Sequence, residues 1–171
     1  MPEPTAYAVS RSDYLVDCIC YARFLIDHGI SKDKDMHRVL LGVRAENAVA
    51  NRCGDASLKQ QLAQMSSRKY EDFKQDFSYV NTYKNIDHRV DVKAKWQQDD
   101  QNLSNHRDLK VVYVFTYPAD GSVSVEANVD LVFAIEGWCP GEMLDHAPAR
   151  LIAPFWCPRG DAKPFKTLLG Y

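Results

Sequence analysis

The first half of the chain carries apolar residues at helical spacing. Between residues 12 and 28 they recur every three or four positions, which predicts a helix that Gly29 can end. The same spacing predicts a second helix from about residue 33 to 52 and a third, more polar one from about residue 56 to 73. Residues 1–10 precede these helices, and we expect them to form a flexible lead-in.

From residue 77 the pattern changes to an alternation of apolar and polar positions, which is typical of strands. Strands are predicted over residues 77–83, 89–96, 110–117 and 128–135, the last ending at Gly137 and Trp138. Segment 89–96 alternates strictly, with three apolar residues on one face and three charged residues on the other. The charged residues are Asp91, Lys93 and Lys95.

Three segments show neither the helical spacing nor the strand alternation of apolar residues. Residues 97–109 are polar and are expected to form a loop or a short helix, and residues 141–146 one or two helical turns. Residues 148–171 are rich in proline and aromatic residues, so we expect them to be mostly irregular.

This order of elements predicts an α+β or mixed α/β fold. N-terminal helices are followed by a mixed, mainly antiparallel sheet of four to five strands. The length of 171 residues suits one domain. Its expected parts are the lead-in, a helical part, a sheet part and a tail, over residues 1–10, 11–73, 74–138 and 139–171.

The charge balance limits the function. There are 21 basic and 23 acidic residues, a formal charge of −2. A dedicated DNA-binding domain is usually clearly basic, so this balance argues against a simple nucleic-acid binder. It does not exclude an enzyme whose carboxylates hold a metal ion while basic residues elsewhere hold phosphates.

The sequence also predicts a cytoplasmic protein. No stretch approaches the ~20 apolar residues that a membrane helix needs, and the start lacks the basic and apolar regions of a secretory signal. Five scattered cysteines without a Cys-x-x-Cys pair indicate reduced thiols rather than a disulfide framework or a zinc site.

Asp91 and Lys93 are the first candidates for chemistry. They lie two residues apart on one face of a predicted strand, about 7 Å between α-carbons. The carboxylate can bind a divalent cation, and the ammonium can stabilise a phosphate or help to orient an attacking water. The alternative is a solvated strand face on which acidic and basic residues alternate for solubility.

Asp76 is the second candidate, because it begins the outgoing strand of the predicted hairpin. Fifteen residues separate it from Asp91, enough for one strand, a turn and a strand back. Two carboxylates brought together repel unless a cation lies between them. Asp87 is the alternative ligand, but it lies about 13 Å from Asp91 along the same strand. Asp76 could equally be a surface residue.

Glu46 is the third candidate. It follows Val39 and Val43 at helical spacing, on the apolar stripe of the second predicted helix. A carboxylate that faces inward needs a partner or a metal ion. The alternative is a residue at the edge of the helix, paired with Arg44 or another basic side chain.

Together these residues resemble the motif of the PD-(D/E)XK nuclease superfamily, which has the restriction-endonuclease-like fold, and its small phage-type members in particular. The resemblance covers about residues 36–145, although Gln75 stands where the family often has proline. The matching stretches are residues 42–52, Asp76, residues 90–95, and a Gly-aromatic-x-x-x-Glu segment at 137–142.

The resemblance implies a core of a helix, three antiparallel strands, a helix and a further strand. It also implies an endodeoxyribonuclease that depends on Mg²⁺ or Mn²⁺. Asp76, Asp91 and the carbonyl of Val92 would bind the metal, and Glu46 would complete its shell. Lys93 would lie beside the attacking water or the scissile phosphate. In-line displacement would leave 5′-phosphate and 3′-hydroxyl ends.

Basic residues near aromatic side chains supply candidate DNA contacts. Lys95 is one step beyond Lys93 on the same face. The others lie in the tail, which could instead pack over the sheet, and they are Arg150, Arg159, Lys163 and Lys166.

The sequence therefore predicts a metal-dependent DNA nuclease of a bacterial or phage-infected cell. Cutting both strands of a duplex would favour a symmetric homodimer. The alternative is a nuclease-like protein without activity, which binds nucleic acid or another protein.

Overall fold

The structure is a computed structural model, and its description covers part of the chain. The described ranges are residues 3–54, 77–81, 86–98, 102–105, 107–151, 153–157 and 161–170. For residues 77–81, 86 and 87 the description covers the backbone only. The predicted helix at 56–73 lies outside the described residues, as do Asp76 and Arg159.

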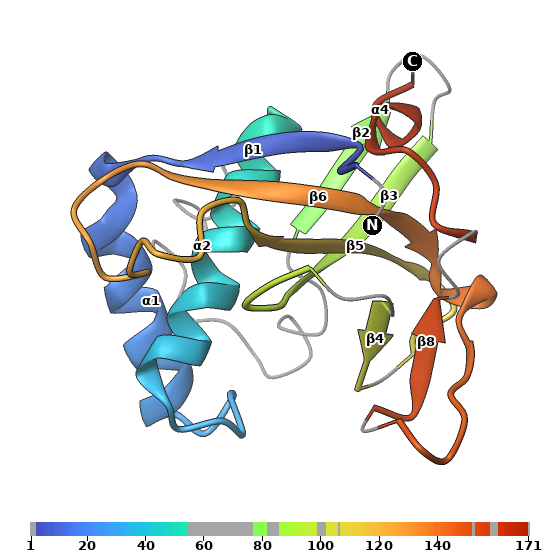
Figure 1. The fold of residues 1–171 in the computed structure, drawn as a ribbon, viewed down its shortest axis with the longest axis horizontal. Coiled ribbons are helices and arrows are strands. Elements are labelled where there is room, and N and C mark those ends of the chain that lie inside the picture. The colour runs from blue at the N-terminus through green and yellow to red at the C-terminus, as the bar shows by residue number, and fades with distance from the viewer. Residues whose placement is uncertain are drawn as a thin grey trace.

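A five-stranded sheet forms the centre of the molecule, with strand order β1-β6-β5-β3-β2 (Figure 1). Helices α1 and α2 cover one face, and a second sheet of order β4-β8-β7 lies against the other. The main elements are β1 (Ala6–Ser10), α1 (Leu15–Asp27), α2 (Met36–Arg52), β2 (Phe77–Asn81), β3 (Ile86–Ala94), β4 (Asn102–Ser104), β5 (Val111–Pro118), β6 (Leu131–Pro140), β7 (Asp145–His146), β8 (Phe155–Cys157) and α4 (Phe165–Leu168).

The pairing confirms a mixed, mainly antiparallel sheet. Three of the four neighbouring pairs of the large sheet are antiparallel: β1 with β6, β5 with β6, and β2 with β3. Only β3 and β5 run parallel, so the chain between them must cross from one end of the sheet to the other. The two predicted helices at 12–28 and 33–52 are confirmed as α1 and α2.

The prediction of a flexible lead-in over residues 1–10 is wrong. Residues Ala6–Ser10 form β1, an edge strand of the large sheet that pairs with β6. Ala8 and Ser10 point inward and are buried. The partner strand lies more than 120 residues later in the chain, so the local pattern gave no sign of this pairing.

Three segments also contain short strands or a bridge that were not predicted, because distant parts of the chain pair with them. The segment 97–109 contains strand β4, which pairs with β8 in the tail. Residues 141–146 form a single 3-10 turn followed by β7, and β6 continues to Pro140. The described part of the tail is mostly irregular, as predicted, and contains β8, α4 and a bridge between Lys163 and Trp138.

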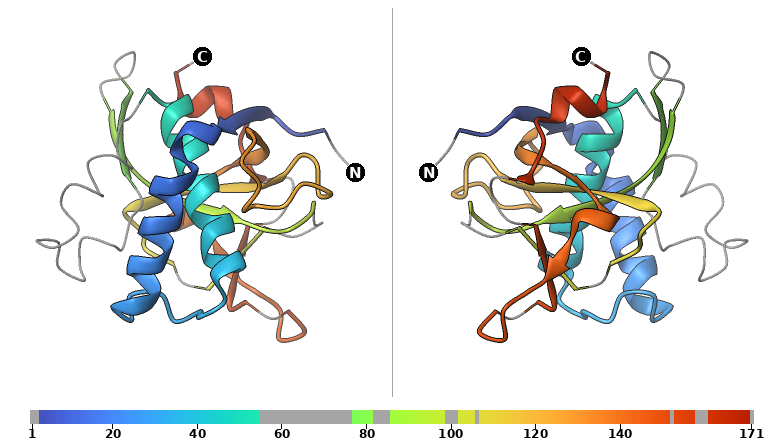
Figure 2. Two further views of the ribbon diagram at one scale, coloured as in Figure 1. Left: turned by 90° about the vertical axis from the view of Figure 1, so that its left-hand side faces the viewer. Right: turned by 90° about the vertical axis from the view of Figure 1, so that its right-hand side faces the viewer.

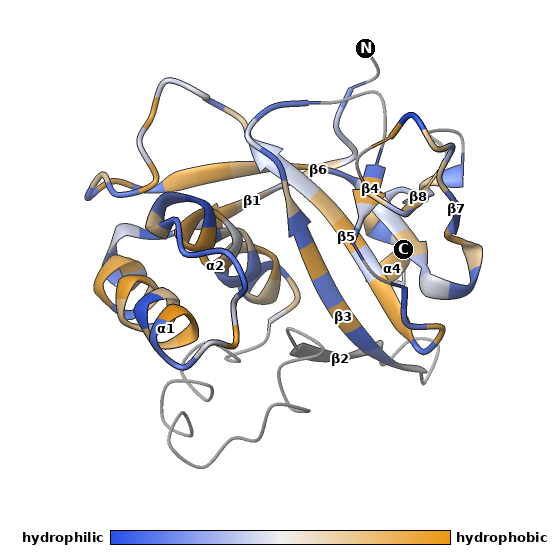
Figure 3. Ribbon diagram, turned by 90° about the horizontal axis from the view of Figure 1, so that it is seen from below, coloured by the Kyte–Doolittle hydropathy of each residue, from blue (hydrophilic) through white to orange (hydrophobic). Residues whose placement is uncertain are grey.

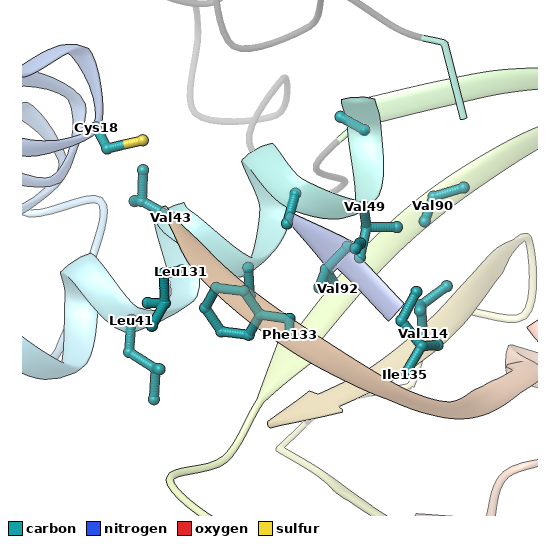
Figure 4. Packing of buried hydrophobic residues seen from close by; sticks show 14 of the residues in the cluster. Cys18, Leu41, Val43, Val49, Val90, Val92, Val114, Leu131, Phe133 and Ile135 are labelled. Carbon is teal, nitrogen blue, oxygen red and sulfur yellow. The ribbon is translucent and has the colours of Figure 1, made fainter. Parts of the chain in front are cut away.

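Two hydrophobic cores lie on the two faces of the large sheet. The larger one packs α1 and α2 against the sheet; Figure 4 shows Val49 of α2 beside Val90 and Val92 of β3. The smaller one lies between the two sheets and includes Tyr113, Phe115 and the buried thiols of Cys139 and Cys157. All five cysteines are free thiols.

No helix of the described ranges is both long enough and apolar enough to cross a bilayer.

Candidate active site

Asp91 and Lys93 lie on the face of β3 that is turned away from the helices. The alternation along β3 is visible in Figure 3 as successive hydrophobic and hydrophilic residues. In the parallel register Asp91 is opposite Tyr113, and Lys93 is opposite Phe115. Both partners belong to the core between the two sheets. The two charged side chains therefore point toward the second sheet.

The two side chains form an ion pair in a partly enclosed place. The Nζ of Lys93 lies 3.4 Å from Oδ1 of Asp91, and their side chains are 23% and 9% exposed. An ion pair shielded from water interacts more strongly than one on an open surface. This enclosure separates the pair from the solvated alternation that was the competing interpretation of Asp91 and Lys93.

Tyr113 forms the wall beside this pair. The Nζ of Lys93 lies 5.9 Å from the centre of the Tyr113 ring. The Tyr113 hydroxyl oxygen accepts a hydrogen bond of 2.7 Å from the backbone N–H of Asp108. Burial raises the pKa of Tyr113 to about 12, and the nearby charge of Asp91 contributes to the same shift. Tyr113 therefore stays neutral beside the ion pair at ordinary pH.

A second ion pair on this side of the sheet joins Lys95 to Glu136. The Nζ of Lys95 lies 3.8 Å from Oε2 of Glu136 and donates a 3.4 Å hydrogen bond to Oδ1 of Asn102. Lys95 is thus held inside the protein, with its side chain 19% exposed. In this position it is not an open contact for a phosphate.

Glu136 reaches Lys95 because of an irregularity in β6. Phe115 of β5 pairs with Gly137 and the next residue, Thr116, pairs with Ile135, which leaves Glu136 as the extra residue of a β-bulge. Sequence reasoning missed Glu136. A signal was present, since a glutamate followed by glycine interrupts an otherwise apolar strand.

Glu46 is buried, as its place on the apolar stripe predicts, but it lies on the other side of β3. Helix α2 packs against the face that carries Val90 and Val92 (Figure 4). The structure therefore brings Asp91 and Lys93 together and leaves Glu46 on the helix side of the sheet.

Arg44, the suggested partner of Glu46, directs its guanidinium elsewhere. It donates to the side-chain and backbone oxygens of Ser10 and to the carbonyl oxygens of Val125 and Val129, at 2.9–3.2 Å. Arg44 therefore ties helix α2 to β1 and to the chain that leads into β6.

The antiparallel pair of β2 and β3 shows where the chain next to Asp76, the second candidate carboxylate, lies. Strand β2 begins at Phe77, which pairs with Val90, the residue before Asp91. Asp76 itself lies outside the described residues, and so does the side chain of Asp87, whose backbone is opposite Val80. Within the described ranges, no three His, Cys, Asp or Glu side chains are grouped so that they could hold a metal ion.

Among the described residues, the basic side chains of the tail do not form one patch. Arg150 and Lys166 are exposed. Arg150 lies in the loop between β7 and β8 and Lys166 in α4, at opposite ends of the molecule in Figures 1 and 2. Lys163 lies over Trp138, with its Nζ 4.9 Å from the ring centre.

Comparison with known protein families, with curated proteins and with solved structures finds no match for this chain.

Proposed function

We propose that the protein is a metal-dependent nuclease that hydrolyses phosphodiester bonds in DNA, with Asp91 and Lys93 at its centre. One observation supports this most: an aspartate and a lysine, two residues apart on an interior strand, form an ion pair that is largely shielded from water. Phosphodiester hydrolysis needs an anionic oxygen to hold a divalent cation and a cationic group beside the reacting phosphate.

The donor set fits a hard divalent cation. Mg²⁺ and Mn²⁺ prefer carboxylate, carbonyl and water oxygens. We assign the carboxylate of Asp91 and the carbonyl of Val92 to the metal, together with the carboxylate of Asp76, which precedes the residue paired with Val90. When bound, the cation supplies charge neutralisation at the phosphate and acidifies a water molecule.

Lys93 has two successive partners in this proposal. Without substrate its ammonium neutralises Asp91, which limits the cost of a partly buried carboxylate. With metal and substrate present, the ammonium turns to a phosphate oxygen or to the attacking water. The water oxygen forms the new bond to phosphorus as the bond to the 3′ oxygen breaks, so the products carry 5′-phosphate and 3′-hydroxyl ends.

The role that we assign to Glu46 differs from the one that the resemblance to the nuclease superfamily implies. Helix α2 packs on the face of β3 opposite to the one that carries Asp91, and this placement does not favour a ligand shared by Glu46 and Asp91. We assign Glu46 to the support of β3 from the helix side. The restriction-endonuclease-like core is part of the same proposal, and the helix α2, the hairpin β2–β3 and the parallel strand β5 would be its components.

The second candidate function is a nuclease-like binding protein without activity. The position of Glu46 favours it, because it removes one carboxylate from the neighbourhood of Asp91. Such a protein would bind nucleic acid or another protein through the same face of the sheet and would need no cation.

Incubation with DNA separates the two functions. Supercoiled, linear, single-stranded and branched DNA are each mixed with the protein in Mg²⁺, Mn²⁺ or EDTA, and the products are resolved on gels. The nuclease proposal expects cleavage in Mg²⁺ or Mn²⁺ and none in EDTA. A retarded band in EDTA without cleavage in either metal would support the binding protein instead.

A further inference from the structure

Two buried thiols are in contact where the second sheet meets the large sheet. Cys139 of β6 and Cys157 of β8 are both 0% exposed and belong to the core between the two sheets. Figure 1 shows β8 ending beside the arrowhead of β6. The S–H group of Cys157 donates a hydrogen bond to the sulfur of Cys139. Two reduced sulfurs from different sheets are thus already neighbours.

This contact lies on the face of the large sheet that carries the candidate site. Asp91 of β3 is opposite Tyr113 of β5, and Tyr113 is opposite Cys139 of β6. Directly paired residues of neighbouring strands project to the same side of a sheet. Asp91, Tyr113 and Cys139 therefore form one row across three strands, and Cys157 contacts the end of that row. A bond between the two sulfurs would hold the cover of the Asp91–Lys93 ion pair.

The second sheet is a cover that can open locally. Asn102 of β4, which pairs with Cys157, accepts a 3.4 Å hydrogen bond from Lys95 and so adds another attachment to the large sheet. The strands of the second sheet are only two or three residues long. Because such strands make few hydrogen bonds, their local opening costs less than unfolding the large sheet. Local opening gives an oxidant access to the two thiols.

The two thiols differ in reactivity. The hydrogen bond from Cys157 stabilises the thiolate of Cys139 and lowers the pKa of Cys139, although burial opposes this shift. The same hydrogen bond, together with burial, raises the pKa of Cys157. A thiolate is the form that attacks a disulfide. Cys139 is therefore the attacking residue, and Cys157 is the resolving one.

We propose that Cys139 and Cys157 form a redox-sensitive pair, whose disulfide fastens the second sheet over Asp91 and Lys93. The Cys139 thiolate attacks one sulfur of a disulfide oxidant such as oxidised glutathione, and the first glutathione leaves as a thiolate that takes a proton from water. Cys157 then attacks the sulfur of Cys139, and the second glutathione leaves with the proton of Cys157. Two protein thiols are oxidised to one disulfide, and the disulfide of the oxidant is reduced to two thiols. Disulfides between facing sheets are compatible with the geometry of sheet sandwiches.

Oxidation of the folded protein tests the pair directly. Cys20→Ser and Cys53→Ser first remove the thiols that are less buried, and the reduced protein is then incubated with excess oxidised glutathione. After alkylation and digestion without reductant, mass spectrometry should find a Cys139–Cys157 disulfide. Cys18 is the matched control, because it is equally buried but lies in α1, on the helix side of the large sheet, and should remain a thiol.

Single variants test the order of attack. Cys157→Ser should accumulate a glutathione adduct on Cys139, whereas Cys139→Ser should leave Cys157 mostly a thiol. In the intact pair the disulfide closes a loop over residues 139–157, so we expect the melting temperature to rise by about 6–12 °C. Dithiothreitol should reverse this rise. An adduct that forms mainly on Cys157 would overturn the assigned order.

The accessibility of Lys93 measures whether the cover is fastened. Acetylation followed by mass spectrometry should be at least about twofold slower at Lys93 in the oxidised protein than in the reduced one, since local opening exposes the amine. The exposed Lys32 is the control and should react equally in both forms. Equal rates at Lys93 would mean that the bond does not fasten the cover.

Two results would overturn the pair itself. One is the absence of a Cys139–Cys157 bond in protein whose fold is verified by circular dichroism. The other is a bond that forms only at urea concentrations that unfold the whole protein. None of these measurements uses DNA or a metal ion, so the pair can hold or fail independently of the proposed nuclease.

Discussion

The ammonium nitrogen of Lys93 lies 3.4 Å from the carboxylate of Asp91, two residues earlier on the same face of β3. The sheet supplies this relationship, because residues i and i+2 of a strand point the same way. Tyr113 and the second sheet supply the enclosure. Strand β3, Tyr113 and the second sheet together make Asp91 and Lys93 an ion pair that is shielded from water. In the proposed reaction, metal and substrate would separate this pair.

Removal of either charge should abolish the proposed cleavage. For Asp91→Asn and Lys93→Met we expect the rate of DNA cleavage in Mg²⁺ to fall at least 100-fold, since loss of one electrostatic stabiliser typically costs about 10²–10³ in rate. Gel assays at saturating Mg²⁺ measure the rate. The exposed residues Asp13 and Lys32 provide controls, as Asp13→Asn and Lys32→Met, and these should cleave like the wild type. Undiminished cleavage by folded Lys93→Met protein would remove Lys93 from the mechanism.

Glu46 and Asp91 lie on opposite sides of β3, and we expect them to have different roles. Asp91→Asn should weaken Mn²⁺ binding more than tenfold, whereas Glu46→Gln should leave it within about twofold, because Glu46 lies on the helix side. Titration calorimetry with Mn²⁺ alone measures both affinities without DNA. A tenfold loss of Mn²⁺ affinity in Glu46→Gln would return Glu46 to the metal shell.

The elements that the sequence predicts well are those whose pattern is local. Segment 89–96 alternates strictly because one face of β3 packs on the helices, and this alternation also defines Asp91 and Lys93. Helix α2 shows its apolar stripe for the same reason. Both the strand and its candidate chemistry could therefore be read from a few neighbouring residues.

The elements that the sequence does not predict depend on distant partners. Strand β1 and strand β4 pair with residues far along the chain, and neither has a period long enough to indicate a strand. The side of the sheet on which Glu46 falls is decided by how α2 packs, and helical periodicity does not contain that information. Glu136 is a site candidate only because a bulge turns it towards Lys95.

Ionisation of Tyr113 should destabilise the fold at alkaline pH. Its pKa is about 12 in the folded protein against an ordinary value of about 10. Between these values the unfolded chain releases the proton and the folded chain keeps it. The contribution of Tyr113 to the free energy of unfolding is therefore fully present below pH 10 and decreases as the pH rises towards 12.

Urea titrations at pH 8, 10 and 11 measure this decrease. Tyr113→Phe should be less stable at pH 8, because the acceptor for the N–H of Asp108 is lost, but should show a shallower decrease above pH 10. In Tyr113→Phe the decrease of the free energy of unfolding with pH should become smaller but should not disappear, since burial also raises the pKa of Cys18 to about 12. Parallel pH profiles for wild type and variant would show that Tyr113 does not titrate in this range.

Gly141 should tolerate no side chain. A Cβ atom there would overlap the backbone carbonyl of Asp108 and lie 2.9 Å from the carbonyl oxygen of Val111. We expect Gly141→Ala to destabilise the protein by about 2 kcal/mol or more, because backbone has to move. Gly121→Ala is the control, since nothing lies within 4 Å of its Cβ position, and it should change stability by less than about 1 kcal/mol. Thermal unfolding compares the two, and equal midpoints would mean that the chain at Asp108 yields easily.

Among the described residues, Arg44 should be a charged position that is very sensitive to substitution. It is fully buried, and its guanidinium donates to five oxygens, of which four are backbone carbonyls of Ser10, Val125, Ala127 and Val129. Burial lowers its pKa. Arg44→Lys keeps the charge but offers only three donors from a single nitrogen, so several buried carbonyls lose their partner.

We expect Arg44→Lys to cost about 3 kcal/mol, which for a chain of this length corresponds to a melting point lower by about 6–12 °C. The exposed Arg38 is the matched control, and Arg38→Lys should stay within about 0.5 kcal/mol. Hydrogen exchange adds a local readout: the amides of β1 and of residues 125–129 should exchange faster in Arg44→Lys than in Arg38→Lys. Unchanged exchange there would mean that strand pairing with β6 alone holds β1 in place.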